Sequence, residues 1–327
     1  MPLAVLARRL LTGVVLLWLV VSLTFLLVHL APGDPAALLL PPSASAADAA
    51  RLRTRLGLDA PLGVQYVRWI GGVARGDLGT SVALDRPVSR VLGDALPITL
   101  GLGATSLALT FVVGVAVGTW QAVRRGHRDD LALTVAATTV YAAPSYWLSL
   151  VAIALFTYGA ARWHFPPALR LPAFGVRDPS GQLTGVAATV DLVRHAVLPV
   201  LVLSGVGAAG IARYARAAML DVLGGDFVRT ARAKGAPPAR VYGRHALANA
   251  LPPLVVLLAL AFPGVVAGSV FVESVFAWPG MGRAMVQAIA QRDYPVVLGA
   301  TLLYAALVIA ANLAADLLLP ALDPRRR

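Results

Sequence analysis

Six stretches of this sequence are apolar over lengths close to the roughly 20 residues that a helix needs to cross the hydrocarbon core of a bilayer. No water is present inside lipid to bond an open N–H or C=O, so each stretch must satisfy its backbone internally, as a helix does. The predicted spans are residues 11–30, 97–120, 131–158, 195–212, 252–272 and 295–319. We therefore expect an all-α integral membrane protein with six transmembrane helices.

The composition agrees with this class. Hydrophobic residues make up 58% of the 327 and charged residues only 13%, with a mean hydropathy of +0.75, whereas soluble domains carry about 25% charged residues. The chain has no cysteine, which excludes disulfides, thiolate metal sites and cysteine nucleophiles. The first span follows Arg8 and Arg9, and because its apolar run exceeds the roughly 7–15 residues usual in a signal peptide, we expect an anchored helix.

The basic residues outside the spans predict the orientation of the chain. One alternating set of segments comprises residues 1–10, 121–130, 213–251 and 320–327, and the other comprises 31–96, 159–194 and 273–294. Arg and Lys are about twice as dense in the first set, which by the positive-inside rule faces the cytoplasm, so both termini are predicted inside. This topology, with attraction to anionic membrane lipid, explains the net charge of +12 better than binding of nucleic acid does.

Two of these segments are too long to be simple connectors. The outer segment 31–96 is predicted to form a small helical cap. Its short amphipathic stretches are residues 52–58, 64–70 and 88–96. The inner segment 213–251 carries seven basic residues and has apolar positions at helical spacing, which Gly235 and the pair Pro237-Pro238 interrupt. We expect a helix, a turn and a second helix there.

The sequence offers little that could capture energy. Ionisable residues inside spans mark ion-coupled transport, but the middles of the predicted spans carry no Asp, Glu, Lys or Arg. His29, His195 and Asp316 lie near span ends and are interpreted as interface residues. A P-loop needs Gly-Lys followed by Ser or Thr, and the only lysine, Lys234, is followed by glycine. Energy for transport must therefore come from another protein.

Other motifs favour helix packing over chemistry. Residues 205–210 match the dinucleotide pattern G-x-G-x-x-G, but they lie in a predicted span without a βαβ context, so we interpret them as small residues at a close helix contact. The same interpretation applies to Gly114 with Gly118 and to Gly264 with Gly268. No H-E-x-x-H or G-x-S-x-G motif is present, so the sequence does not support enzyme chemistry. Prolines that can kink a span are Pro144, Pro199 and Pro263.

The inner segment carries a more specific signal. Residues 226–235 read Asp-Phe-Val-Arg-Thr-Ala-Arg-Ala-Lys-Gly, and residues 244–252 read Arg-His-Ala-Leu-Ala-Asn-Ala-Leu-Pro. This pattern resembles the cytoplasmic EAA loop of ABC importer permeases, in the form found in the dipeptide/oligopeptide/nickel branch. Arg229 replaces the Glu of the general consensus and Thr230 its first Ala, departures that are typical of this branch. The residues that the resemblance assigns to coupling with an ATPase are Asp226, Arg229, Thr230, Ala231, Arg232, Ala233, Lys234, Gly235, His245, Leu247 and Asn249.

The resemblance extends in order over nearly the whole chain. Other matching segments are Pro32-Gly33-Asp34-Pro35, Leu56 to Asp59, Arg75 to Gly79, Arg292 to Pro295 and Leu322 to Arg325. An outer family motif comprises Glu273, Phe276, Trp278, Pro279, Gly280 and Gly282. The large outer loop after the first span resembles that of the B-type of the two paired permeases. The implied fold is that of a type I ABC importer permease with both termini in the cytoplasm.

The resemblance implies a division of work between subunits. The implied partners are a second homologous permease, two cytoplasmic ABC ATPases and an extracytoplasmic solute-binding protein, in a bacterial or archaeal cytoplasmic membrane. This chain would hold no cofactor, because ATP and Mg²⁺ bind to the ATPases. The implied cargo is a peptide or a related small solute such as a nickel chelate, and its selection rests largely with the binding protein. The domains expected are residues 1–96 (first span and outer cap), 97–319 (five-span core with the coupling loop 213–251) and 320–327 (basic tail).

Two other classes remain open from the residues alone. An ion-coupled secondary transporter or a channel would be expected to show coupling carboxylates or an inverted repeat. A membrane enzyme would need a nucleophile and a base at matching depth. Neither class has a positive feature in the sequence.

Overall fold

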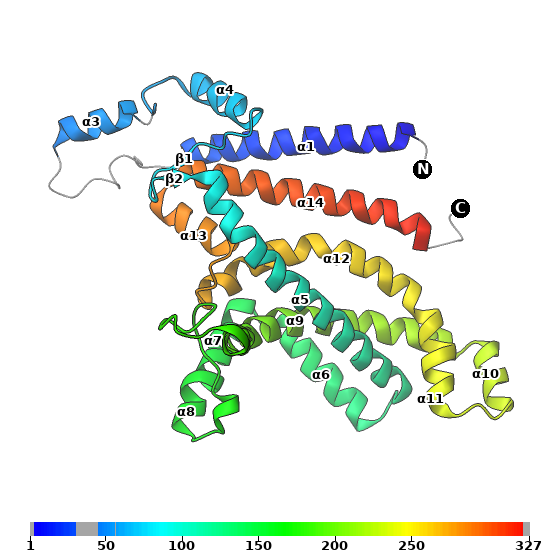
Figure 1. Ribbon diagram of the computed structural model, residues 1–327. Helices are drawn as coiled ribbons and strands as arrows, with labels where there is room; N and C mark the ends of the chain where they lie inside the picture. The colour runs from blue at the N-terminus through cyan, green and yellow to red at the C-terminus, as the bar shows by residue number, and fades with distance from the viewer. Residues whose placement is uncertain (1–2, 31–44, 56, 323–327) are drawn as a thin grey trace. The chain divides into compact units, whose positions relative to one another are not determined.

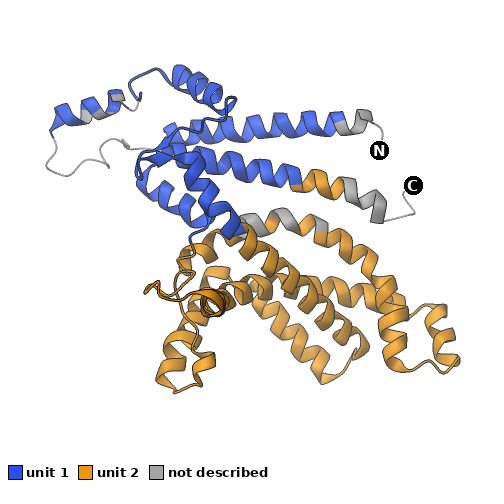
Figure 2. Ribbon diagram, in the orientation of Figure 1, with its two compact units in different colours: residues 1–99, 279–310 blue, residues 100–278, 311–327 orange. Residues whose placement is uncertain are grey.

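The computed structural model (Figure 1) describes residues 3–30, 45–55 and 57–322, apart from some side chains within the helices. Two segments singled out in the sequence, Pro32 to Pro35 and residues 323–327 with the end of the Leu322–Arg325 match, lie outside the described residues. The chain divides into two compact units, which are described separately. One comprises residues 1–99 with 279–310, and the other comprises residues 100–278 with 311–327 (Figure 2).

Long apolar helices dominate the described residues. Four of them are long and apolar enough to cross a membrane, namely α1 (Leu3–Leu30), α5 (Val88–Val123), α9 (Gly185–Leu223) and α14 (Tyr294–Leu322). A bent pair of helices, residues 128–142 and 145–162, makes the number five if it forms one span. Another helix, α12 (Ala248–Val275), covers the predicted span 252–272 but stands outside this count because several of its side chains are not described. The helical membrane class is thus confirmed, whereas the number six stays a prediction.

The third predicted span, 131–158, is not one straight helix, because it bends at Pro144, one of the prolines that the sequence marks as able to kink a span. The helix α6 (Arg128–Ala142) ends before Pro144, and α7 (Ser145–Ile153) begins after it at an angle of 106°. A proline ring disfavours the helical region for the preceding residue, and Ala143 is extended, with φ −77° and ψ 134°. A π-helical turn (Ala154–Gly159) and the short α8 (Ala160–Arg162) complete this arm.

Two other prolines predicted to kink spans do not interrupt them. The helix α9 continues through Pro199 and α12 through Pro263. The helix α5 likewise contains Pro97. Within a membrane, neighbouring helices and local adjustments of the backbone can satisfy the group that a proline leaves open.

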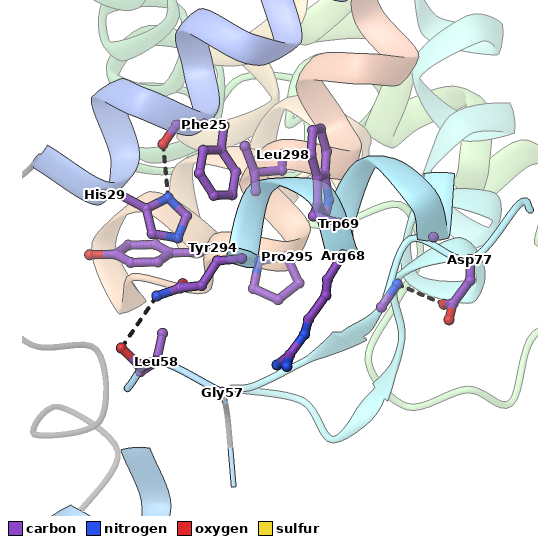
Figure 3. Close-up of a pocket in the computed structure, with 13 residues that line it drawn as sticks. Phe25, His29, Gly57, Leu58, Arg68, Trp69, Asp77, Tyr294, Pro295 and Leu298 are labelled. Atoms are coloured by element: carbon purple, nitrogen blue, oxygen red, sulfur yellow. Dashed lines mark hydrogen bonds between the residues drawn. The ribbon is translucent and has the colours of Figure 1, made fainter. Parts of the chain in front are cut away.

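In the first unit, the segment after α1 is partly helical, as predicted. The helix α4 (Leu62–Val73) covers the predicted amphipathic stretch 64–70, and α3 (Ala46–Arg55) covers only the beginning of the stretch 52–58. Leu56 lies outside the described residues, and a turn follows at Gly57 and Leu58. The third stretch, 88–96, is instead the beginning of α5. The helix α4 packs on the last turns of α1, where the hydroxyls of Tyr66 and Ser22 lie 2.6 Å apart and the rings of Trp69 and Phe25 stack (Figure 3).

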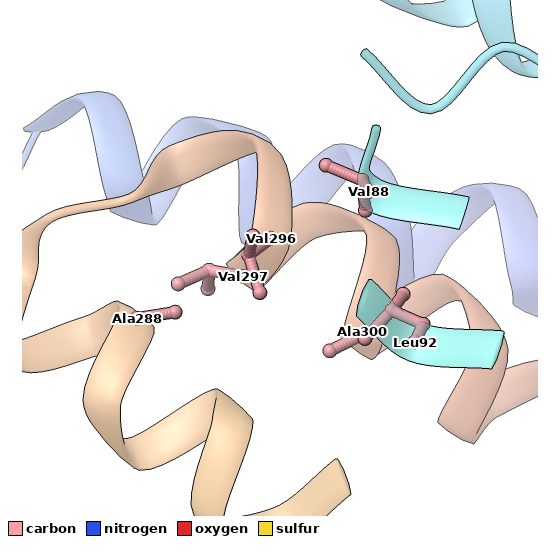
Figure 4. Close-up of a cluster of buried hydrophobic side chains, with 6 residues drawn as sticks. All are labelled: Val88, Leu92, Ala288, Val296, Val297 and Ala300. Carbon is pink, nitrogen blue, oxygen red and sulfur yellow. The ribbon is translucent and has the colours of Figure 1, made fainter. Parts of the chain in front are cut away.

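A two-stranded ladder that the sequence did not predict precedes α5. The strands β1 (Thr80–Ser81) and β2 (Arg86–Pro87) pair in antiparallel fashion. The core of the first unit lies where the start of α5 and the helix α13 (Met281–Gln291) meet the first turns of α14 (Figure 4). Its buried side chains are Val88, Leu92, Ala288, Val296, Val297 and Ala300.

The second unit is built around α9, against which α6, α7 and α12 pack. Several of its glycine contacts agree with the predicted close packing of helices. The prediction for Gly264 is wrong, because no atom of the described residues lies within 4 Å of a Cβ built there, and Gly268 lies outside the side chains that the structure describes. A Cβ on Gly114 would lie 2.7 Å from Cβ of Ile211, and a Cβ on Gly118 would lie 2.7 Å from Cβ of Ala215, both on α9. The residues of the G-x-G-x-x-G match lie in α9, where Gly207 faces Thr110. A buried hydrophobic cluster of this unit consists of Ile153, Ala173, Leu198, Val202, Val272 and Phe276.

Candidate functional site: the basic loop between α9 and α12

The inner loop has the helix-turn-helix form predicted from the sequence. After α9 ends at Leu223, Gly224 and Gly225 lead into α10 (Asp226–Ala233). The chain then turns at residues 234–237 and returns through α11 (Pro238–Arg240) and a π-helical turn (Val241–Leu247) into α12 (Figure 1). The loop is shorter than the predicted segment 213–251, because α9 continues ten residues beyond its start.

Buried side chains attach the loop to the ends of the long helices. Val228 of α10 and Val241 of the returning segment are 0% and 1% exposed. The returning segment packs on the last turns of α5 and α9 through a small apolar cluster. This cluster consists of Ala122, Met219, Ala246 and Ala250, with Leu220, Val222, Leu223 and Leu247 packed against it. The helix α10 packs against the returning segment, and this segment packs in turn on α9 and α12.

The turn of the loop is a complete Schellman motif, which explains the glycine at position 235. The N–H of Ala236 donates to the carbonyl of Ala231 at 3.1 Å, and the N–H of Gly235 donates to the carbonyl of Arg232 at 2.9 Å. Gly235 has φ +75°, a left-handed conformation in which a Cβ is unfavourable. No atom of the described residues lies within 4 Å of a Cβ built there, so the space beside Gly235 is open.

The remainder of α10 and its turn is exposed and carries cations. The exposed basic residues are Arg229, Arg232, Lys234, Arg240 and Arg244. Asp226 lies 3.2 Å from Arg229, but both side chains are at least three-quarters exposed, so this pair contributes little to stability. Arg232 lies over the ring of Tyr242 at 5.9 Å and links the two arms of the loop. The arrangement offers an exposed cationic surface suited to an acidic partner.

The other predicted coupling residues have local roles. Thr230 donates its hydroxyl to the carbonyl of Asp226 at 3.0 Å, and Asn249 donates its side-chain amide to the carbonyl of His245 at 2.6 Å. His245 and Leu247 are half-buried in the returning segment, and Ala231 is half-buried in α10. The structure thus places the predicted residues from Asp226 to Gly235 on α10 and its turn, and His245, Leu247 and Asn249 in the returning segment and the first turn of α12.

Sequence analysis missed one interaction at the base of the loop. Arg216 of α9 donates from Nε and Nη2 to the two carboxylate oxygens of Asp130 at 3.0 and 2.9 Å. The same carboxylate accepts the N–H of Gly126 at 3.1 Å. Both residues had been interpreted only as charges in cytoplasmic segments. No local pattern links two positions 86 residues apart, although an acidic residue in a basic segment was a signal that could have prompted a search for a partner.

The outer family motif divides at the boundary between the two units. In the second unit, Glu273, Phe276 and Trp278 are nearly inaccessible, and the N–H of Trp278 donates to the carbonyl of Glu273 at 2.8 Å. The carbonyl of Phe276 also accepts the N–H of Gly175 at 2.9 Å. Glu273 belongs to the last turn of α12, whereas Phe276 and Trp278 follow the end of that helix at Val275, so the motif has a structural role in this unit.

In the first unit, Pro279, Gly280 and Gly282 belong to the start of α13. Gly280 is the residue before that helix, and the N–H of Met281 donates to Thr99 Oγ1 at 2.8 Å. Gly280 and Gly282 are buried, whereas Pro279 is exposed. Within the described ranges, no three His, Asp or Glu side chains gather closely enough to hold a metal ion.

Comparison with known proteins identifies the family to which this chain belongs. Residues 114–327 match the family described as binding-protein-dependent transport system inner membrane component, and residues 2–103 match the model of its N-terminal region. The chain belongs to this family. The resemblance to ABC importer permeases of the peptide branch is thereby confirmed, and the chain is a multi-pass permease of the inner membrane type.

Curated relatives of this permease cover almost its full length. The oligopeptide transport system permease protein AppB of Bacillus subtilis is 36% identical over 98% of each chain. The dipeptide transport system permease protein DppB of Escherichia coli is 37% identical over 93% of each chain. The glutathione transport system permease protein GsiC of Salmonella typhimurium is 38% identical over 98% of this chain and 97% of its own. A solved chain of an amino acid ABC transporter has a TM-score of 0.48 and 16% identity, covering 72% of this chain and 94% of its own.

Proposed function

We propose that this permease forms half of the translocation path of an ABC importer for peptides, and that the loop 226–250 couples it to an ATPase. The observation that carries this proposal is the loop itself, whose exposed cationic helix α10 packs against the returning segment, which packs in turn on α9 and α12. The names of the relatives support a peptide cargo, because those proteins serve oligopeptide, dipeptide and glutathione systems.

The proposed assembly contains four kinds of protein. A second, homologous permease completes the path, two cytoplasmic ATPases hydrolyse ATP, and an extracytoplasmic protein delivers the solute. The membership of the binding-protein-dependent family supports the last two partners in general terms. With both termini in the cytoplasm, as the basic residues predict, α10 would face the ATPases.

The proposed mechanism is alternating access driven from α10. Closure of the ATPases around ATP moves α10, and the returning segment, which packs against α10, α9 and α12, passes this movement to the two long helices. The two helices then tilt between an inward-open and an outward-open state, which nucleotide and the loaded binding protein favour to different extents.

Substitutions of Gly235 test the docking role. The variant Gly235→Ala introduces only the strain of a left-handed alanine, whereas Gly235→Trp adds bulk in the open space beside the turn. A third variant, Gly235→Asn, tolerates the conformation. We expect Gly235→Trp to lose nearly all peptide uptake and to co-purify poorly with the ATPase, while Gly235→Asn and Gly235→Ala retain most of both. Normal uptake by Gly235→Trp in the reconstituted complex would exclude docking at this turn.

The absence of cysteine allows a direct test of orientation. A membrane-impermeant thiol reagent added to sealed right-side-out vesicles should leave Lys234→Cys unlabelled and should label Ala83→Cys, which lies in the turn between β1 and β2. Inverted vesicles should give the opposite result. Labelling of Lys234→Cys from outside would overturn both the topology and the coupling role.

A further inference from the structure

A pocket of about 320 Å³ lies in the first unit, where the end of α1 meets α4 and the start of α14 (Figure 3). Its apolar wall consists of Phe25, Trp69, Tyr294, Pro295 and Leu298. His29 stacks on Phe25 with ring centres 4.0 Å apart and lies 5.3 Å from Tyr294. The volume is within the range of small-molecule sites.

The wall of the pocket that α14 forms packs against the core of the first unit. Val296 and Val297, which follow Pro295 directly, are 2% and 5% exposed and pack against Val88 and Ala288 (Figure 4). Gln65 holds the opposite rim by donating to the carbonyl oxygens of Leu58 and Ala60 at 3.3 and 2.8 Å. The pocket is therefore a preformed feature of this unit.

The ends of two candidate spans place this pocket at the level of lipid headgroups. The span in α1 ends at Leu30, and the span in α14 begins at Tyr294. The 24 residues of the first span extend about 36 Å at the rise of an α-helix, which exceeds the roughly 30 Å of hydrocarbon by about one turn. His29 lies in that last turn, and its contact with Tyr294 puts both helix ends at one depth. Aromatic rings are enriched at this level of membrane proteins.

The helix α4 has the surface expected of a helix lying in this interface. It contains no buried residue, and its apolar side chains Leu62, Val64 and Val67 are exposed. Arg68 lies on the same helix and lines the pocket. A short amphipathic helix of this kind is stable at the boundary between headgroups and acyl chains, where its apolar side chains leave water.

Two opposite charges line the pocket without pairing with each other. Arg68 has no hydrogen bond or ion pair among the described residues. Asp77 accepts the N–H of Gly79 through Oδ1 at 2.9 Å, which fixes its carboxylate at the other side of the pocket (Figure 3). A guanidinium favours a phosphate, and a carboxylate favours an ammonium group. The pocket thus complements a zwitterion whose two charges are separated by a short link.

We propose that this pocket binds the headgroup of a phospholipid that carries a primary ammonium group, as phosphatidylethanolamine does. The lipid phosphate accepts hydrogen bonds from Arg68, the ammonium group donates to Asp77, and the glycerol end lies along Pro295 and Leu298. The acyl chains then continue along the exposed apolar surface of α1. The bound lipid holds α4 at the outer end of α1 and contributes to the order of the segment that follows it.

Lipid retention by the full-length chain in nanodiscs tests this site. The nanodiscs contain equal parts of phosphatidylethanolamine, phosphatidylcholine and phosphatidylglycerol, and the lipids retained after detergent extraction are counted by native mass spectrometry. We expect retained phosphatidylethanolamine to fall about tenfold in Arg68→Gln, because a charge-assisted hydrogen bond is lost. The variant Asp77→Asn keeps an oxygen for Gly79 but loses the charge, and should no longer distinguish phosphatidylethanolamine from phosphatidylcholine.

The matched control is Arg75→Gln, which removes the same charge from a residue that follows α4, is bonded to the carbonyl of Gly71 and does not line the pocket. It should retain lipid as the unaltered chain does. Equal retention in Arg68→Gln and Arg75→Gln would overturn the proposal. So would displacement of the lipid by a dipeptide at micromolar concentration, which would assign the pocket to a zwitterionic solute, or by glycerol phosphate, which would assign it to a free phosphate. Equal thermal stability of the three variants shows that the comparison reports binding and not folding.

Discussion

Arg216 on α9 and Asp130 on α6 form a two-point ion pair at the base of the loop between α9 and α12, with nitrogen-to-oxygen distances of 3.0 and 2.9 Å. Asp130 is 5% exposed, and its carboxylate also caps the turn at Gly126. The pair therefore ties the turn between α5 and α6 to the helix that leads into α10. A rigid link at this position would help α9 to move as one body when α10 is displaced.

Breaking this pair should destabilise the permease and weaken coupling. In Arg216→Gln the buried carboxylate loses its charged partner, and we expect a loss of about 2–3 kcal/mol in the free energy of unfolding, measured in mixed detergent micelles. The double variant with Asp130→Asn should lose less than the sum of the two single variants, because no buried charge is left unpaired. The control Arg213→Gln removes an exposed guanidinium that lies 4.7 Å from the ring of Tyr141 and should cost about 1 kcal/mol or less. An additive double variant would show that the two charges do not interact.

Two glycines of α5 should respond in opposite ways to the same substitution. In Gly118→Ala the new Cβ would lie 2.7 Å from Cβ of Ala215 and 2.9 Å from the backbone nitrogen of Arg216, so α5 and α9 must separate. We expect a loss of about 1–3 kcal/mol. Among the residues that the structure describes, no atom lies within 4 Å of a Cβ on Gly101, so Gly101→Ala should be neutral or stabilise the helix by up to about 1 kcal/mol. The same unfolding measurement compares them, and similar losses in both variants would contradict the close packing at Gly118.

The features that the sequence predicted well are those that depend on residues close together in the chain. A long apolar stretch in a bilayer forms a helix because its backbone groups must bond within the segment, so hydropathy alone predicts the helices around most of the spans. The turn of the inner loop follows from Gly235, because a helix that ends in a left-handed residue favours glycine, and from Pro237, because proline is common just beyond such an end. The exposed cations of α10 follow from the same amphipathic pattern.

The features that sequence missed depend on distant partners. Pro144 breaks a helix whereas Pro199 does not, and the local sequence does not distinguish them because the outcome depends on what the neighbouring helices can satisfy. The ladder of β1 and β2 has only two residues in each strand, too few to show a period. The pairing of Arg216 with Asp130 arises only after α6 and α9 have packed together.

The pH dependence of the outer segment should report on Asp59. Thr54 donates its hydroxyl to Asp59 Oδ2 at 2.6 Å, and Arg53 lies 3.4 Å from Oδ1. The hydrogen bond from Thr54, with a smaller contribution from Arg53, holds the pKa of Asp59 below its usual value. Because folding lowers the pKa of Asp59, the interaction stabilises the folded segment fully at pH values above the usual pKa near 3.8. This stabilisation is lost as the pH falls through the pKa of Asp59 in the folded state.

The variant Thr54→Val tests this assignment. It should raise the pKa of Asp59 toward the usual value, so the amides at the end of α3 should lose protection from hydrogen exchange at a higher pH than in the unaltered chain. The exchange rates are compared after correction for their intrinsic pH dependence. An unchanged pH midpoint in Thr54→Val would mean that Arg53, and not Thr54, is the main cause of the lowered pKa.

We expect Asp293 to determine the stability of the ladder of β1 and β2. Its carboxylate, only 2% exposed, accepts the hydroxyl of Ser81 and the N–H groups of Val82 and Ala83, the latter two at 3.2 Å. In Asp293→Asn, an amide NH₂ replaces one of the two acceptor oxygens and faces these donors. We therefore expect the free energy of opening the ladder to fall by about 2 kcal/mol. Amide hydrogen exchange over residues 80–88 should then be faster by a factor of about 30. Asp94 provides the control, because it pairs with Arg86 of the same ladder at 2.8 Å but both side chains are more than half exposed. Exchange in Asp94→Asn should rise by no more than about fivefold, and equal increases in the two variants would show that burial of Asp293 does not determine the stability of the ladder.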